Sequence, residues 1–134
     1  MSAVLDTQTA IWYLLGPKKL SPTALHAIRQ ALSKGHPVHI SAISIVEVIY
    51  LVERGRLPFD ALQKLGGALS DSASGMVVAP VDAAVAETVQ KVSRDAVPDM
   101  PDRVIAATAL HLGLPLVTRD RRIRSSESRP SGKG

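Results

Sequence analysis

Short apolar runs alternate along this chain with segments of helical apolar spacing, and this alternation limits the fold more than any other feature. The apolar runs are each long enough for one short strand and occupy residues 2–5, 37–41, 76–81 and 114–118. Strands that alternate with helices form a parallel sheet, and the helices cover both of its faces. The sequence therefore predicts a three-layer α/β/α domain around a short central parallel sheet.

The helical segments between these runs have recognisable first and last residues. One of them has Ser21 as a cap, Pro22 at its first helical position and Gly35 as its stop, which is the usual placement of these residue types. The predicted helices occupy residues 7–15, 21–35, 44–55, 58–70, 82–95 and 101–113. A chain of 134 residues has the length of one domain, and we place that domain at residues 1–124.

Composition limits both the core and the chemistry. Apolar residues make up 46% of the chain and aromatic residues only 3%, so the core is expected to consist of Ala, Val, Leu and Ile. The absence of cysteine excludes disulfides, thiolate metal sites and cysteine nucleophiles. The N-terminal "MSAVLDT" lacks the pattern of a secretion signal, and no apolar run approaches the roughly 20 residues of a membrane span. We expect a cytoplasmic protein that does not enter a membrane.

The net charge of +4 belongs to the end of the chain. Residues 121–134 contain five basic residues and one acidic residue, so the preceding 120 residues are neutral overall. The last ten residues, 125–134, have the Ser, Gly, Pro and Lys composition of a disordered tail. The basic character of the protein therefore leaves room for an acidic pocket in the domain.

Five acidic residues are predicted to gather at one edge of the sheet. Asp6 and Asp120 follow the first and last predicted strands, and Glu47 lies in the first turn of the helix after strand 37–41. Asp99 and Asp102 stand at the start of the helix that leads into strand 114–118. The carboxyl ends of parallel strands and the N-termini of the following helices share an edge, and ligands of such sheets bind there. The sequence therefore predicts a candidate site.

Each acid also has a simpler structural role open to it. Ser44 with Glu47 three residues later has the pattern of a capping box. The other four acids could cap helices, or could stabilise helices by lying near their positive N-terminal ends. Several carboxylates at one edge would repel one another unless a cation neutralised them. Mg²⁺ or Mn²⁺ prefers oxygen ligands of this kind, so a hard-metal site is the alternative to separate caps.

Other kinds of site have weaker support. The four histidines, His26, His36, His39 and His111, are scattered over predicted helices and strand ends, so we expect structural or surface roles. No phosphate-binding Gly-Lys-Ser/Thr motif and no nucleophile-elbow motif occurs. An aspartyl-phosphate phosphatase would need a second Asp two residues after Asp6, where this chain has Gln8.

Four blocks, in order, carry a family resemblance: "AVLDT", "SAISIVEV", "DRVIAATAL" and "LVTRD". They resemble the four acidic blocks of the PIN domain, and above all those of VapC-like ribonuclease toxins from toxin–antitoxin pairs. The resemblance covers residues 2–124. It implies that Asp6, Glu47, Asp102 and Asp120 are the family's first to fourth acids, which hold Mg²⁺ or Mn²⁺ for the hydrolysis of RNA phosphodiester bonds.

The resemblance also implies auxiliary residues and partners. Thr118 matches a hydroxyl residue often found two positions before the last acid, and Asp99 matches an extra acid of one subgroup. Family members bind a cognate VapB-like antitoxin and are commonly homodimers, for which helices 23–32 and 59–69 could supply a surface or could instead pack on the sheet. Arginines near the acids could anchor RNA phosphates or be solvated surface residues; they are Arg103, Arg119, Arg121 and Arg122.

One part of the family pattern is not evident here. PIN domains usually have one more apolar strand after the last acid, but "RRIRSSESRPSGKG" contains no apolar residue except Ile123. The usual last edge strand could therefore be missing, which would leave the Asp120 region less supported. A PIN-like fold with poorly assembled acids would bind RNA or a protein partner without cutting, and this binding module is the alternative to a nuclease.

Overall fold

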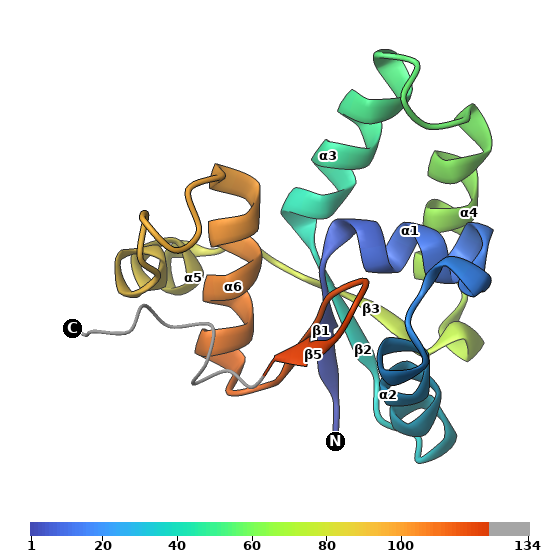
Figure 1. The fold of residues 1–134 in the computed structure, drawn as a ribbon, viewed down its shortest axis with the longest axis horizontal. Helices are drawn as coiled ribbons and strands as arrows, with labels where there is room; N and C mark the ends of the chain where they lie inside the picture. The colour runs from blue at the N-terminus through green and yellow to red at the C-terminus, as the bar shows by residue number, and fades with distance from the viewer. Residues whose placement is uncertain (124–134) are drawn as a thin grey trace.

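The computed structural model describes residues 1–123 and confirms the predicted α/β architecture (Figure 1). A five-stranded sheet has the order β3-β2-β1-β4-β5. Pairing is parallel among the first four strands, with Leu5 opposite Ile40 and Val117, and β5 is antiparallel to β4. The strands are β1 (Ala3–Leu5), β2 (Val38–Ser41), β3 (Met76–Ala79), β4 (Leu116–Val117) and β5 (Arg122–Ile123).

Helices cover both faces of this sheet. In Figure 1, α5 and α6 lie on one side of the strands, whereas α1, α2 and α4 lie on the other. The α-helices are α1 (Thr7–Leu15), α2 (Pro22–Ser33), α3 (Ala42–Glu53), α4 (Phe59–Ser70), α5 (Ala83–Thr88) and α6 (Met100–Leu112). Short 3-10 turns are η1 (Pro17–Lys19), η2 (Ser72–Ser74) and η3 (Val89–Lys91). Within residues 1–123, none of the helices has the length and apolar character needed to cross a membrane.

Strand β1 lies at the centre of the core because its side chains point alternately to both covered faces. Leu5 packs into the cluster formed with α1, α2 and α4, whereas Val4 packs against Ile105 and Ala109 of α6. All of these side chains are buried. As the composition predicts, the fully buried positions are mostly Ala, Val, Leu and Ile, which allow close helix–sheet packing.

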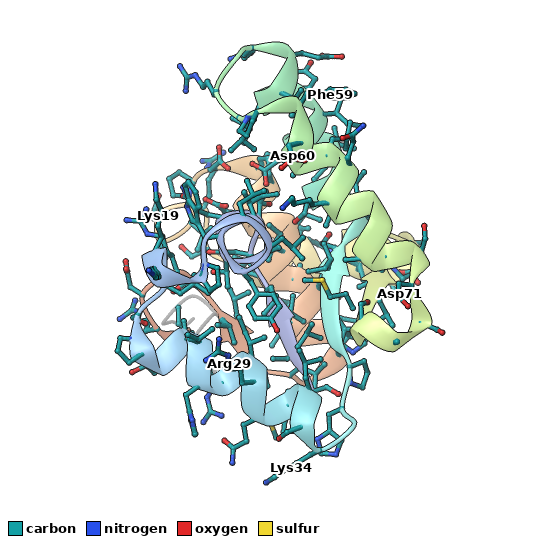
Figure 2. The ribbon with its side chains drawn as sticks, turned by 90° about the vertical axis from the view of Figure 1, so that its right-hand side faces the viewer. Lys19, Arg29, Lys34, Phe59, Asp60 and Asp71 are labelled. Carbon is teal, nitrogen blue, oxygen red and sulfur yellow. The ribbon has the colours of Figure 1, made fainter. Side chains whose placement is uncertain are left out.

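The outer surface of the helical layer is charged, with basic residues along η1 and α2 and both signs on α4, where Lys64 pairs with Asp60 at 3.7 Å. Figure 2 shows Lys19, Arg29 and Lys34 along η1 and α2, and Asp60 and Asp71 at the two ends of α4. The apolar faces of α2 and α4 point inward, where residues such as Ile28 and Leu65 are buried. These two helices therefore pack on the domain, as the simpler of the two predictions had it.

Three sequence-based predictions about the fold are corrected by the structure: two concern helix boundaries and one concerns the last strand. The third helix begins at Ala42, because Ser41 rather than Ser44 is its cap and the Ser41 hydroxyl accepts a hydrogen bond from the Ile43 amide at 3.2 Å. The predicted helix 82–95 ends at Thr88 and continues only as the η3 turn. The reason is tertiary: Arg103 of α6 donates to the carbonyls of Val89 and Val92 at 3.0 and 2.9 Å and so stabilises the turn.

The third correction concerns the last edge strand, which is present as β5. The amide and hydroxyl of Thr118 both bond the Arg121 carbonyl, at 2.7 and 3.0 Å, and this tight turn brings the chain back beside β4. Ile123 then packs against the cluster that contains Leu116. One apolar residue therefore suffices for the strand. The predicted tail, residues 125–134, lies outside the described residues.

Candidate functional site

Four of the five predicted acids line one pocket at the carboxyl edge of the sheet. The pocket has a volume of about 380 Å³, and Asp6, Glu47, Asp99 and Asp102 belong to its lining. Asp6 directly follows β1, and Glu47 lies in the second turn of α3 because that helix starts early. Asp99 and Asp102 come from the start of α6. Apolar residues of α1 and α3, including Trp12 and Leu51, complete the wall.

Asp6 combines the structural role and the candidate site role. Its Oδ1 atom accepts a hydrogen bond from the Thr9 amide at 2.8 Å and so caps α1. The cap fixes the carboxyl group at the mouth of the pocket, since it follows β1 without any intervening residue. The helix-cap interpretation and the metal-site interpretation of Asp6 are therefore compatible.

Glu47 is held by a hydroxyl network that the sequence did not suggest. Thr7 Oγ1 lies 2.5 Å from Glu47 Oε1 and 2.8 Å from Ser44 Oγ. Thr7 and Ser44 are both buried. The predicted capping box between Ser44 and Glu47 is wrong, because Ser44 lies inside α3 and contacts α1 instead.

Asp99 and Asp102 occupy the start of α6 much as the sequence indicates. Asp99 is the cap, and its Oδ2 atom accepts a bond of 3.4 Å from the Asp102 amide. Asp102 is exposed as a whole residue, but it lines the pocket and borders a second pocket on its other side. The carboxyl group of Asp102 therefore stands between two hollows of the surface.

Burial, together with the negative charge of neighbouring acids, raises the pKa of three of these acids. Partial burial is the main reason that the pKa of Asp6, of Glu47 and of Asp102 lies above its ordinary value. The negative charge of Asp99 and Asp6 further raises the pKa of Asp102 and of Glu47. The Thr7 hydroxyl acts in the opposite direction on the pKa of Glu47. The folded domain thus holds acids that repel one another and would gain from a bound cation.

The raised pKa values of these acids predict a dependence of stability on pH. A carboxyl group whose pKa is raised by folding binds more protons in the folded than in the unfolded state, so it stabilises the fold below its ordinary pKa of 3.8 (Asp) or 4.5 (Glu) and loses that contribution as pH rises through the folded pKa. We expect the metal-free free energy of unfolding to fall across that window, less steeply in Asp102→Asn. Urea unfolding in EDTA measures both slopes, and equal slopes would contradict the prediction.

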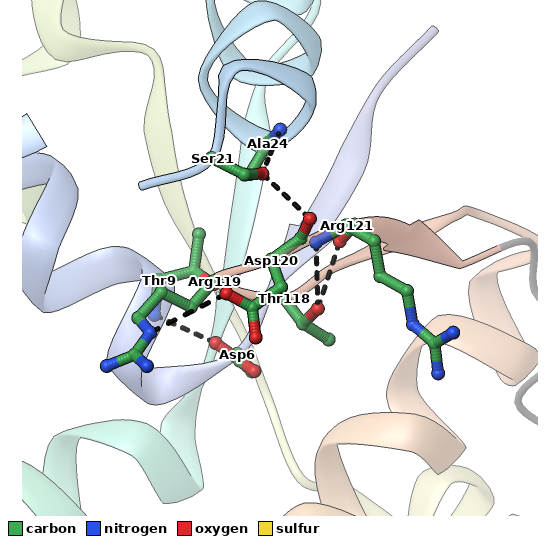
Figure 3. Close-up of polar contacts among 8 residues, drawn as sticks. All are labelled: Asp6, Thr9, Ser21, Ala24, Thr118, Arg119, Asp120 and Arg121. Carbon is green, nitrogen blue, oxygen red and sulfur yellow. Dashed lines mark hydrogen bonds and ion pairs between the residues drawn. The ribbon is translucent and has the colours of Figure 1, made fainter. Parts of the chain in front are cut away.

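Asp120 does not join the pocket. Its side chain is 81% exposed and pairs with Arg119 at 3.9 Å. Ser21 fixes the backbone there, since its amide donates to the Arg119 carbonyl at 3.1 Å and its hydroxyl to the Asp120 carbonyl at 2.8 Å (Figure 3). Asp120 is still near enough for its charge to raise the pKa of Asp6. Within residues 1–123, no three His, Asp or Glu side chains are arranged to hold one metal ion.

The second pocket gives a place to two further predicted residues. It has a volume of about 370 Å³ and is lined by Asp6, Asp102, Thr118 and Arg121, among others. The Thr118 hydroxyl is engaged in the β4–β5 turn (Figure 3). Asp6 and Asp102 border both pockets, so the two hollows adjoin along these carboxylates.

The predicted arginines differ in their positions. Arg119, Arg121 and Arg122 are exposed on the β4–β5 turn and β5. Arg103 is half-buried, and its guanidinium donates to the two carbonyls of the η3 region. These bonds give Arg103 a structural role, and its contact with RNA stays a prediction.

Comparisons with known proteins agree with the fold and the family. The sequence model of the PIN domain matches residues 3–127, and the chain belongs to this family. "Ribonuclease VapC22" of Mycobacterium tuberculosis (strain ATCC 25618 / H37Rv) is 33% identical over 124 residues, which are 92% of this chain and 91% of that protein.

Two solved structures share the architecture. VapBC2 from Rickettsia felis, bound to a DNA fragment from its promoter, gives a TM-score of 0.62 at 19% identity and covers 87% of this chain and 86% of the other. A toxin–antitoxin complex from Klebsiella pneumoniae gives a TM-score of 0.55 at 25% identity, covering 85% and 82%. The first of these likenesses concerns the fold alone.

Proposed function

We propose that this PIN-domain protein is a metal-dependent endoribonuclease and the toxin of a toxin–antitoxin pair. The observation that carries the proposal is the pocket at the carboxyl edge of β1, where Asp6, Glu47 and Asp102 all have a raised pKa. Acids whose pKa is raised and that share one cleft mark a candidate active site. The relative with 33% identity is a ribonuclease by name, which supports the same activity.

The donor set suits a hard divalent cation. All candidate ligands are carboxylate oxygens, which Mg²⁺ and Mn²⁺ prefer, and a cation would relieve the mutual repulsion of the three acids. Asp6, Glu47 and Asp102 would hold it after their side chains drew together, because no three acids of residues 1–123 are arranged around one ion in this structure. Asp99 would be an auxiliary, and Asp120 would be a fourth ligand once its side chain turned from Arg119. When bound, the ion would activate a water molecule and offset charge on the leaving oxygen of the phosphodiester.

The adjoining pockets suggest how RNA would lie on the surface. With the scissile phosphate near Asp6 and Asp102, one side of the strand would face Arg121 in the second pocket and the other side would face Trp12 in the first. Arg119 and Arg122 would attract further phosphates without reading sequence.

A protein partner is part of the proposal. Both structural neighbours described above are toxin–antitoxin complexes, which favours a VapB-like antitoxin for this chain too. An apolar pocket of about 470 Å³ beside Glu47 is lined by Val46, Tyr50 and Met100, and these three side chains are 49–61% exposed. Exposed apolar groups of this size are typical of surfaces that proteins bury on association. A homodimer remains a prediction from the family resemblance, and a cytoplasmic location remains a prediction from the sequence.

Cleavage of mixed cellular RNA by the purified chain tests the nuclease. We expect cutting with Mg²⁺ or Mn²⁺, none in EDTA, recovery when the metal is restored, and no cutting by Asp102→Asn. Cutting that persists in Asp102→Asn would indicate a contaminant or a different site. RNA binding by both proteins, with no cleavage by the unmutated chain, would instead favour the binding module.

A further inference from the structure

A two-hydroxyl network links α1 to the acid pocket and has no assigned role. Thr7 is 8% and Ser44 is 1% exposed, and their hydroxyl oxygens lie 2.8 Å apart. Glu47 Oε1 lies 2.5 Å from the same Thr7 oxygen. Thr7 directly follows Asp6 in the sequence, so the residue at the centre of this network is adjacent to another acid of the pocket.

The direction of the two hydrogen bonds follows from counting protons. The Thr7 hydroxyl has one hydrogen, and an ionised Glu47 carboxylate can only accept. In the form of the protein that would bind a cation, Thr7 therefore donates to Glu47 Oε1, and Ser44 donates to Thr7. The hydrogen bonds from Ser44 to Thr7 and from Thr7 to Glu47 thus fix the position of Oε1. The other carboxylate oxygen of Glu47 is then free to bind a cation, and its direction is set by the fixed Oε1.

We propose that Thr7 is a positioning residue, whose hydroxyl, oriented by Ser44, holds the Glu47 carboxylate in place for a divalent cation in the acid pocket. The inference rests on the proposed function and deepens it. Glu47 is the one acid of the pocket on α3, and its carboxyl group is at the end of a side chain with several rotatable bonds. Asp6 and Asp99, in contrast, are each fixed by a helix cap. Thr7 supplies for Glu47 the fixation that caps supply for those two acids.

A calorimetric titration of the full-length chain with Mn²⁺ tests this role without any activity assay. We expect Thr7→Val to weaken Mn²⁺ binding by about 10-fold or more, which is the loss typical of groups that orient a metal ligand. Thr7→Ser keeps the hydroxyl and is expected to bind like the unmutated protein. Thr108→Val is the matched control: Thr108 is likewise a buried threonine, but its hydroxyl bonds the Val104 carbonyl within α6.

A double-mutant cycle distinguishes positioning of Glu47 from a general effect on the fold. If Thr7 acts through Glu47, Thr7→Val has no further effect on Mn²⁺ binding in a Glu47→Gln background. Equal losses in both backgrounds, or Mn²⁺ binding by Thr7→Val that equals the unmutated protein, would overturn the inference. Ser44→Ala, which keeps the Thr7 hydroxyl but removes its orienting donor, is expected to give a smaller loss, and it serves if Thr7→Val does not fold.

The same titrations separate this inference from the proposed function. Saturable Mn²⁺ binding that disappears in Asp102→Asn but is unchanged in Thr7→Val would leave the metal site standing and remove the role of Thr7. An unmutated protein without saturable Mn²⁺ binding would overturn both.

Discussion

Asp6→Asn is expected to lower RNA cleavage by about 10²- to 10³-fold, which is the loss typical of removing one preorganised group from an active site. Asp6 borders both pockets, so its carboxylate is near any phosphate bound between them. Asparagine caps a helix about as well as aspartate does, so the hydrogen bond from the Thr9 amide is retained and α1 should keep its start. The rate of cleavage of a defined RNA in Mn²⁺ measures the effect.

Asp82→Asn is the matched control for this experiment. Asp82 caps α5 by accepting from the Val85 amide at 3.0 Å, and it is exposed and absent from the lining of both pockets. The same chemical change at a second helix cap should leave cleavage unaltered. A similar loss in both variants would mean that capping rather than the site explains the effect, and unaltered cleavage by Asp6→Asn would remove Asp6 from the site.

Arg103→Met is expected to lower the free energy of unfolding by roughly 2–4 kcal/mol, because two part-buried hydrogen bonds from a charged donor are lost. These bonds run from Arg103 Nη2 to the carbonyls of Val89 and Val92, and they join α6 to the η3 turn. Methionine keeps most of the length and apolar contact of the arginine side chain. Urea unfolding measures the change, which should appear as a lower midpoint with an unchanged slope.

Arg119→Met should change RNA binding but hardly change the free energy of unfolding, which is the opposite of what we expect for Arg103→Met. Its ion pair with Asp120 is on the surface, where such pairs contribute about 1 kcal/mol at most. If Arg119 contacts an RNA phosphate, its loss reduces the salt dependence of RNA affinity by roughly 0.7–1 in the logarithmic slope, whereas Arg103→Met leaves that slope unchanged. Both should be measured in an Asp102→Asn background, so that RNA stays intact. A reduced slope in Arg103→Met would return Arg103 to the RNA surface.

The acids of the site were predictable because each is placed by a local element. Asp6 follows a strand of apolar residues, and Asp99 caps a helix whose start and stop are written in Pro101 and Gly113. Once strands and helices alternate, the parallel topology brings these positions to one edge whatever the details of packing. The family resemblance then added the roles of the residues, which local patterns do not give.

Other features were beyond reach of the sequence because they depend on groups distant in the chain. Thr7 and Glu47 are forty residues apart, and their bond required α1 and α3 to meet. The early end of α5 depends on Arg103 of α6. The outward position of Asp120 depends on the hydrogen bond from the Ser21 hydroxyl to its carbonyl, whereas the sequence indicated only that Ser21 is a helix cap.

The sequence by itself determined the alternation of strands and helices, the buried aliphatic core and the gathering of four acids, because each rests on periodicity, caps and the fixed direction of a parallel sheet. Only the tertiary structure decided which polar groups meet. Arg103 bonds backbone carbonyls, Thr7 bonds Glu47, and Ile123 packs as part of a fifth strand. A side chain makes few hydrogen bonds, and the partners that it finds are set by which elements pack beside it.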